Sequence, residues 1–199
     1  MLENILGHTV ETGLLQPGNW ALDAGCLGFG FTNALLDRGL KVVALDPGEK
    51  TAPERSGLFF HQAALVGNHS KHFRWEEVGH SAPSSHLVEA ENDQVKTYTV
   101  QELMQEHGID RFALIKLDIE GSEYHVLDAI SGPIAQQLSV EFHLHLWHFF
   151  AKSLVEAEER QVRTYEHLIR WYEPRYYFKQ RLPVFDCDNF IDTLFIEKP

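Results

Sequence analysis

Cysteine is scarce in this chain: among its 199 residues, only Cys26 and Cys187 carry a thiol. Two cysteines do not form the disulfide framework that stabilises small secreted domains, so a reducing, cytoplasmic location is expected. The N-terminal stretch has neither a basic segment nor a long apolar run, which argues against a signal peptide. No apolar segment is long enough to span a bilayer, which argues against a membrane protein.

Positive charge is also scarce. The chain carries 17 Lys and Arg against 29 Asp and Glu, which gives a formal net charge of -12. Such a field repels phosphate backbones and anionic lipids, so we expect neither a nucleic-acid partner nor a membrane partner. Lys and Arg are scattered along the sequence, and no basic cluster changes this expectation.

The order of the predicted elements indicates one α/β domain over residues 1–199. Apolar residues at helical spacing predict an N-terminal helix within residues 1–16. Short apolar runs then alternate with helical segments, as in a mostly parallel sheet with helices on both faces. A long helix is expected over about 152–172, and strands at 176–182 and 190–196 follow it. Those two strands should pair antiparallel, because a parallel pair needs a crossover.

Residues 66–98 are the least regular part of the sequence and contain Gly, Asn, Ser, Pro and several histidines. We expect an irregular flap or hairpin insertion there, with FRWEEV (73–78) and VKTYTV (95–100) as its strands. Two capping boxes, Thr51 to Glu54 and Thr99 to Glu102, predict the starts of two short helices.

A glycine-rich loop, DAGCLGFG at residues 23–30, lies between a predicted strand and a predicted helix. Glycines let the backbone approach a ligand closely, although many α/β turns need glycine only in order to turn. Asp46 closes the next strand, where nucleoside-binding sheets place a carboxylate for the ribose hydroxyls. Asp23 precedes the glycines, where a carboxylate repels pyrophosphate and suits a cationic amino-acid group. S-adenosylmethionine combines a nucleoside with such a group; the alternative for each acid is ordinary strand-end capping.

The stretch 112–128, FALIKLDIEGSEYHVLD, runs from an apolar strand through an acidic turn into a helix. Lys116, Asp118 and Glu120 alternate with apolar residues, so they share one face of an extended segment. A charged row at the end of a central strand is costly unless its members are paired or used in function.

A second polar row follows in the strand predicted over 138–146, where Glu141, His143 and His145 alternate with apolar residues. If the two strands are neighbours, Lys116 neutralises Glu141 or Asp118 in the interior. The outer residues of both rows then line a pocket beside the methyl donor. The alternative is an internal ion-pair network without a catalytic role.

Histidine and cysteine are two further residue types that can act as functional groups. The pair His143 and His145 matches a chelating H-x-H pattern, but no H-E-x-x-H helix or cysteine cluster accompanies it, and we assign no metal ligand. Cys26 lies inside the glycine loop, where a small apolar filler is favoured over a nucleophile because no partner base is evident.

These motifs together resemble the FkbM-type family of S-adenosylmethionine-dependent methyltransferases. The most specific segment is LIKLDIEGSEYHVLDAI (114–130), which is similar to the family's pattern of lysine, aspartate, glutamate-glycine and glutamate. The other matching segments are WALDAGCLGFGFT (20–32), VVALDP (42–47), TYTVQEL (97–103) and SVEFHLH (139–145). The resemblance implies a seven-stranded, Rossmann-like class I methyltransferase fold that ends in an antiparallel hairpin.

The resemblance also implies S-adenosylmethionine as cofactor and O-methylation of a hydroxyl on a small molecule or a sugar. The residues expected to bind the cofactor are Asp23, Gly25, Cys26, Leu27, Gly28, Asp46, Pro47 and Ala63. We expect Asp118 or His143 to be the general base for the acceptor hydroxyl and Glu120 to orient it. The chain has little N-terminal cap, and a partner chain in a homodimer is one way to complete the pocket.

Two other functions compete with methyl transfer. A nicotinamide-dependent oxidoreductase on a related fold needs G-x-G-x-x-G directly after the strand, and both Asp23 and the glycine spacing argue against it. A non-catalytic module that keeps the fold and the cofactor is the second alternative.

Overall fold

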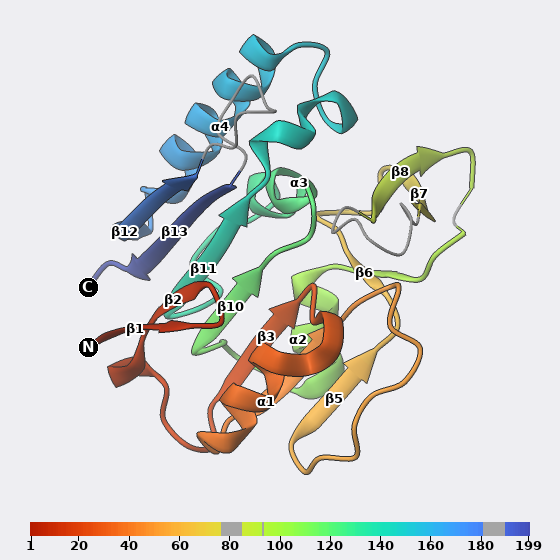
Figure 1. The fold of residues 1–199 in the computed structure, drawn as a ribbon. Coiled ribbons are helices and arrows are strands. Elements are labelled where there is room, and N and C mark those ends of the chain that lie inside the picture. Colours follow the sequence, from red (N-terminus) through yellow and green to blue (C-terminus); the bar gives the residue numbers. More distant parts are fainter. Residues whose placement is uncertain (77–84, 93, 181–189) are drawn as a thin grey trace.

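A seven-stranded sheet forms the centre of the computed structural model, which describes residues 1–76, 85–92, 94–180 and 190–199 (Figure 1). The strand order is β12-β13-β11-β10-β3-β4-β5. The strands are β3 (Trp20–Ala24), β4 (Lys41–Leu45), β5 (Leu58–His61), β10 (Leu114–Leu117), β11 (Gln137–Phe142), β12 (Tyr172–Gln180) and β13 (Phe190–Glu197). The expected mixed α/β fold, with a mostly parallel sheet and an antiparallel closing hairpin, is confirmed.

The chain reverses its direction of travel across the sheet between β3 and β10. From β3 it moves outward through β4 to β5, and it returns to the other side of β3 through β10 and β11. All five of these strands are parallel. In such sheets ligands bind at the carboxyl ends of the strands, at the point where the order reverses.

Alternating residues cover the two faces of the sheet. Ala21, Val42, Ala44 and Leu114 pack under α1 (Gly30–Asp37). Residues of the opposite parity, among them Leu22, Val43, Ile115 and Leu117, belong to the larger core on the other face. That core includes side chains of α2 (Val100–His107), α3 (Glu123–Asp128) and α4 (Leu154–Leu168). Helices therefore lie on both faces, as expected.

The predicted N-terminal helix is wrong: residues 1–16 form a β-hairpin and a short 3-10 turn. Strands β1 (Leu2–Ile5) and β2 (His8–Glu11) pair antiparallel around Leu6 and Gly7, which both have positive φ. This is the backbone of a two-residue hairpin turn. Gln137 of β11 holds the hairpin, because its side chain accepts from the Glu11 amide at 2.7 Å and donates to the Glu11 carbonyl at 3.1 Å. Figure 1 shows the hairpin beside β11.

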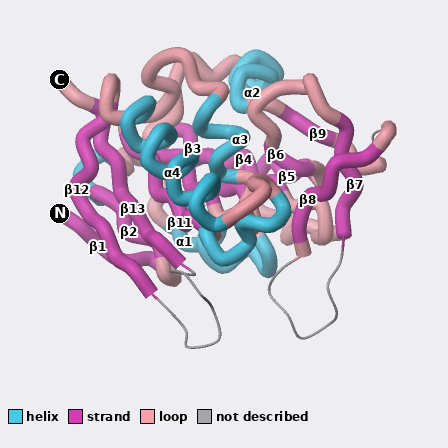
Figure 2. The backbone as a smooth tube through the Cα atoms, turned by 90° about the horizontal axis from the view of Figure 1, so that it is seen from above, coloured by secondary structure: helices cyan, strands magenta, loops and turns pink. Residues whose placement is uncertain are grey.

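The insertion contains a hairpin, but its strands differ from those expected. Strand β7 (His72–Glu76) pairs with β8 (His86–Ala90), while the short β9 (Thr97–Tyr98) pairs with β6 (Ala64–Leu65). The last two residues of the predicted strand 73–78 lie outside the described residues. Figure 2 shows β7 and β8 at the opposite end of the molecule from β12 and β1.

Helix boundaries follow local signals only in part. The capping box of Thr99 and Glu102 opens α2 as predicted, whereas the segment from Thr51 to Glu54 is not helical. Helix α4 ends at Leu168, and Tyr172 and Pro174 belong to the edge strand β12, where proline is tolerated. Within the described residues, no helix has the length and apolar character needed to cross a membrane.

Candidate active site at the reversal of strand order

Gly25 and Asp118 bring the loops after β3 and β10 into direct contact. The Asp118 amide donates to the carbonyl of Ala24 at 3.2 Å, and Gly25 has φ +79°. A Cβ atom on residue 25 would lie only 1.8 Å from the backbone oxygen of Asp118. Glycine is therefore required at this position by the packing of one strand end against its neighbour.

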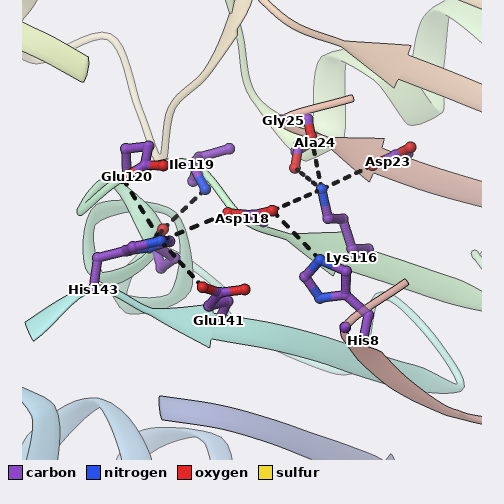
Figure 3. A network of polar contacts seen from close by, with 12 residues as sticks. His8, Asp23, Ala24, Gly25, Lys116, Asp118, Ile119, Glu120, Glu141 and His143 are labelled. Carbon is purple, nitrogen blue, oxygen red and sulfur yellow. Dashed lines mark hydrogen bonds and ion pairs between the residues drawn. The ribbon is translucent and has the colours of Figure 1, made fainter. Parts of the chain in front are cut away.

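Lys116 is buried at this junction and holds several acceptors together (Figure 3). Its ammonium group donates to the carbonyls of Ala24 at 3.3 Å and Gly25 at 2.7 Å, and it pairs with Asp23 at 3.2 Å and Asp118 at 3.3 Å. Burial alone would lower the pKa of Lys116, but the two carboxylates outweigh burial and raise it. Lys116 is thus a fixed cation that neutralises Asp118, one of the two partners predicted from the sequence.

Asp118 uses its two carboxylate oxygens toward different groups. Oδ2 faces Lys116 and lies 3.4 Å from Nε2 of His8, which the N-terminal hairpin supplies. Oδ1 faces His143, 3.6 Å from its Nε2. Burial by itself would raise the pKa of Asp118, but Lys116, His8 and His143 hold it well below its usual range. Asp118 is therefore an anion that lies between Lys116 and His8 on one side and His143 on the other.

His143 follows β11 and is held by a buried carboxylate on α3. Its Nδ1 hydrogen-bonds Glu123 at 2.9 Å, and Glu123 also accepts from the amides of Ile119 at 2.9 Å and Gly121 at 3.0 Å. Burial alone would lower the pKa of His143, but the carboxylates of Glu123, Glu120 and Asp118 together raise it to about 10. The imidazole is then protonated at neutral pH, which disfavours the general-base role expected for it.

Glu120 and Glu141 complete the cluster around His143. Their carboxylate oxygens lie 3.6 Å and 3.5 Å from Nε2 of His143. Burial, aided by the nearby Asp118 charge and opposed by His143, raises the pKa of both groups to about 7. Glu120 has φ +52°, a strained backbone conformation for a non-glycine residue that is typical of functional positions.

The parallel pairing of β10 with β11 explains why the two polar rows meet. Lys116 pairs with Ser139 and Leu117 with Val140, so continuing this register brings Asp118 level with Glu141. The predicted second row is shorter than expected, because β11 ends at Phe142 and a 3-10 segment, η3 (Leu144–Phe149), follows. His145 therefore lies on η3 and does not extend the row of β11.

The glycine loop lies beside Asp46 at the end of β4. The carboxylate of Asp46 accepts from the amides of Gly48 and Glu49, and burial raises the pKa of Asp46. Glu49 in turn accepts from the Gly28 amide at 2.7 Å, which ties the two loops together. Gly28 has φ +68° and faces open space. Leu27 is 75% exposed on the same loop, and Pro47 follows Asp46 directly.

Three residues expected to contact the cofactor are buried in the structure. Asp23 has no exposed surface, and its carboxylate pairs with Lys116 and accepts from the Thr32 hydroxyl at 2.6 Å, so no exposed carboxylate oxygen faces the position predicted for an ammonium group. The Cys26 thiol packs in the core under α1, where burial and Asp23 raise its pKa. Ala63 is fully buried in the larger core. The side chains of these three residues therefore pack beneath the surface of the protein.

The hairpin β7–β8 contacts segments on both sides of the site. The Trp75 indole lies against Gly48, within 3.5 Å of where a Cβ of residue 48 would be. The His86 ring stacks on Phe149 of η3, with the ring centroids 3.7 Å apart. The insertion thus reaches the loop after β4 and the segment after β11.

Sequence reasoning did not assign two members of the site, His8 and Glu123. The sequence predicts a helix where the hairpin carrying His8 forms, so no sequence signal places His8 near Asp118. Glu123 did leave a signal, since it is the final glutamate of the motif in residues 114–130. Its role became visible only when the structure placed it against His143 and the turn at Gly121.

The chain matches the model of a known protein family. The model of the family described as Methyltransferase FkbM domain covers residues 31–177, well over half of the sequence. This range includes Asp46, the motif of residues 114–130 and His143. No curated protein matches the sequence significantly.

Several solved structures are similar to the chain at low sequence identity. A candidate hemolysin from Streptococcus thermophilus is 11% identical, with a TM-score of 0.51 over 95% of this chain and 67% of its own. A TehB-like SAM-dependent methyltransferase from Corynebacterium glutamicum is 15% identical, with a TM-score of 0.43 over 94% and 84%. The N-methyltransferase NodS from Bradyrhizobium japonicum is 10% identical, with a TM-score of 0.46 over 94% of each chain. The first of these likenesses shows a common fold.

Proposed function

Because the chain belongs to the FkbM methyltransferase domain family, we propose that it transfers a methyl group from S-adenosylmethionine to a hydroxyl of a small molecule or a sugar. The observation that carries this proposal is the cluster of Asp118, Glu120, Glu141 and His143 at the carboxyl ends of β10 and β11. It lies next to the glycine loop, where the strand order reverses.

The cofactor is proposed to lie across the loops after β3 and β4. Asp46 is suited to the ribose hydroxyls, and the backbone around Gly28 approaches the ligand without a side chain in the way. Leu27 and Pro47 provide apolar contacts on either side. Asp23 acts indirectly, since it fixes Lys116, which in turn fixes the Gly25 carbonyl. The sulfonium methyl then points toward Asp118.

The acceptor hydroxyl is proposed to lie among Asp118, Glu120 and His143. Methyl transfer is an in-line displacement, so these groups must hold the oxygen opposite the sulfur while its proton is removed. Asp118 is committed to Lys116 and His8, and Glu123 to two amides and His143. Glu120 and Glu141 accept no hydrogen bond from any other described residue, so one of them receives the proton.

We expect Glu141→Gln to lower kcat by about 100- to 10,000-fold, the usual cost of losing a general base. Affinity for S-adenosylhomocysteine should stay unchanged, because Glu141 has no hydrogen bond or ion pair with the described residues of the loops after β3 and β4. The assay follows labelled S-adenosylmethionine against a panel of sugars and small polyols. Glu158→Gln on the exposed side of α4 is the matched control. A variant with near-normal kcat would remove Glu141 from this role and leave Glu120.

Calorimetric titration separates the proposed activity from the nicotinamide alternative. We expect S-adenosylhomocysteine to bind saturably and NAD to show no heat of binding. Asp46→Asn should weaken S-adenosylhomocysteine binding about tenfold, because the asparagine replaces a charged acceptor of the ribose hydroxyls by a neutral one. Binding of NAD in preference to S-adenosylhomocysteine would overturn the proposed function. Cofactor binding without transfer to any acceptor of the panel would favour the non-catalytic alternative.

A further inference from the structure

Nε2 of His143 lies at the centre of three carboxylate oxygens. Oε1 of Glu141 is 3.5 Å away, and Oδ1 of Asp118 and Oε2 of Glu120 are each 3.6 Å away (Figure 3). These separations exceed the usual length of a hydrogen bond. They match the spacing of atoms that share one metal ion, since ligands about 2.0–2.2 Å from an ion lie roughly 3–3.6 Å from one another.

The other ring nitrogen of His143 is arranged as in a metal-binding histidine. Nδ1 lies 2.9 Å from the fully buried carboxylate of Glu123, which two backbone amides hold in place. A hydrogen bond from Nδ1–H to a fixed carboxylate selects the tautomer whose Nε2 lone pair can coordinate an ion. Metal-ligating histidines usually donate their other ring N–H to a carboxylate, a backbone carbonyl or a water.

The charge of the cluster also favours a cation. Five carboxylates, namely Asp23, Asp118, Glu120, Glu123 and Glu141, meet one lysine and two histidines, Lys116, His8 and His143. Oε2 of Glu120 is buried and accepts no hydrogen bond from the described residues. Buried carboxylates are stable only when they are paired or bind a metal.

We propose that Asp118 Oδ1, Glu120 Oε2 and His143 Nε2 bind a divalent transition-metal ion, Mn²⁺ or Zn²⁺. One imidazole and two carboxylates form a mixed donor set, which suits these ions better than an all-oxygen set suits Mg²⁺ or Ca²⁺. The three ligand atoms lie within 4.8 Å of one another. The ion takes the place of the Nε2 proton, which passes to solvent. Oδ2 of Asp118 stays with Lys116 and His8, so the carboxylate bridges both groups.

This site deepens the proposed function, on which its chemical role rests. A hydroxyl coordinated to the ion is more acidic than a free hydroxyl, so its proton leaves more easily. Glu141 lies beside the three ligands and remains available to receive that proton. An acceptor with two neighbouring hydroxyls, such as a sugar or a catechol, would fill two open positions of the ion.

A second histidine cluster in the described part of the chain provides the matched control. His61 and His107 lie with Glu106 within 4.8 Å, but the two rings already hydrogen-bond each other at 2.9 Å. Glu106 is largely exposed. This direct hydrogen bond accounts for the second cluster without an ion, so Glu106→Gln should leave metal binding unchanged.

The test measures Mn²⁺ binding to the purified, chelator-treated protein. Binding is read from the loss of the free Mn²⁺ signal in electron paramagnetic resonance. We expect one site, competed by Zn²⁺, whose affinity falls more than about tenfold in Glu120→Gln and about 10- to 100-fold in Glu123→Gln. Circular dichroism melting checks that each variant is folded. If Glu123→Gln does not fold, the Mn²⁺ affinity of the isosteric variant Glu120→Gln decides the outcome.

The possible outcomes distinguish a failure of the proposed metal site from a failure of the proposed methyl transfer. Absence of saturable Mn²⁺ and Zn²⁺ binding by the wild type overturns the site, as does equal binding by folded Glu120→Gln. A drop in Glu106→Gln alone would place the ion at the second cluster and also overturn the proposal. Full methyl transfer in excess chelator overturns the ion's role and leaves the methyltransferase standing. Metal binding without any S-adenosylhomocysteine binding would contradict the proposed methyltransferase function but support the metal site.

Discussion

Gly25→Ala should destabilise the protein by about 4 kcal/mol or more, the range of the most disruptive single substitutions. The added Cβ would lie 1.8 Å from the Asp118 backbone oxygen, and the residue would have to adopt φ +79°. Relief requires β3 and β10 to separate at their carboxyl ends, where the Ala24 carbonyl accepts from the Asp118 amide. Urea unfolding measures the effect, and insoluble expression is its extreme form.

Gly18→Ala is the matched control for this variant. Gly18 has φ +85°, close to that of Gly25, but a Cβ atom added to residue 18 would have no neighbouring atom within 4 Å. Its substitution should cost only about 1 kcal/mol, the strain of a left-handed alanine. Equal destabilisation by the two variants would mean that the loops after β3 and β10 are not in contact as described.

Lys116→Met is expected to destabilise the protein by about 3–5 kcal/mol, because it leaves a buried carboxylate without its counter-ion. Asp23 has no exposed surface, and after the change the Thr32 hydroxyl is its one remaining side-chain partner among the described residues. Loss of the ammonium group also releases the Gly25 carbonyl. Chemical denaturation of the variant and the wild type at the same pH gives the difference in free energy of unfolding.

A double variant separates charge from packing in this prediction. Adding Asp23→Asn to Lys116→Met removes the uncompensated charge, so the pair should be more stable than Lys116→Met alone. Lys50→Met, at an exposed lysine, should change stability by less than about 0.5 kcal/mol. If Lys116→Met behaved like Lys50→Met, the buried ion pair with Asp23 would not exist in solution.

The part of the site that lies on parallel strands could be predicted from the sequence. Alternation placed Lys116 and Asp118 on one face of their strand, and parallel neighbours bring equal parities together at the same edge. The structure confirms that β10, which Asp118 follows directly, and β11, which carries Glu141, are adjacent and in the required register. The family motif around residues 114–130 identified the same strand end independently.

The rest of the site depends on tertiary contacts that local sequence patterns do not encode. Leu2, Ile5, Leu6, Val10 and Leu14 fit helical spacing, yet a hairpin forms because Gln137, far along the chain, binds its backbone. His8 thereby reaches Asp118. In the strand predicted over 138–146, the alternation of polar and apolar residues continues to His145, but the observed strand ends at Phe142. The complete burial of Asp23 and Ala63 likewise cannot be read from the sequence around them.

The most direct test of the central claim is a crystal structure of the protein with S-adenosylhomocysteine. The account predicts that the ribose hydroxyls contact Asp46, that the ligand crosses the loop containing Gly28, and that its sulfur faces the cluster of Asp118, Glu120 and His143. A ligand bound away from the carboxyl ends of β3 and β4, or a sulfur turned away from that cluster, would contradict the proposed site of methyl transfer.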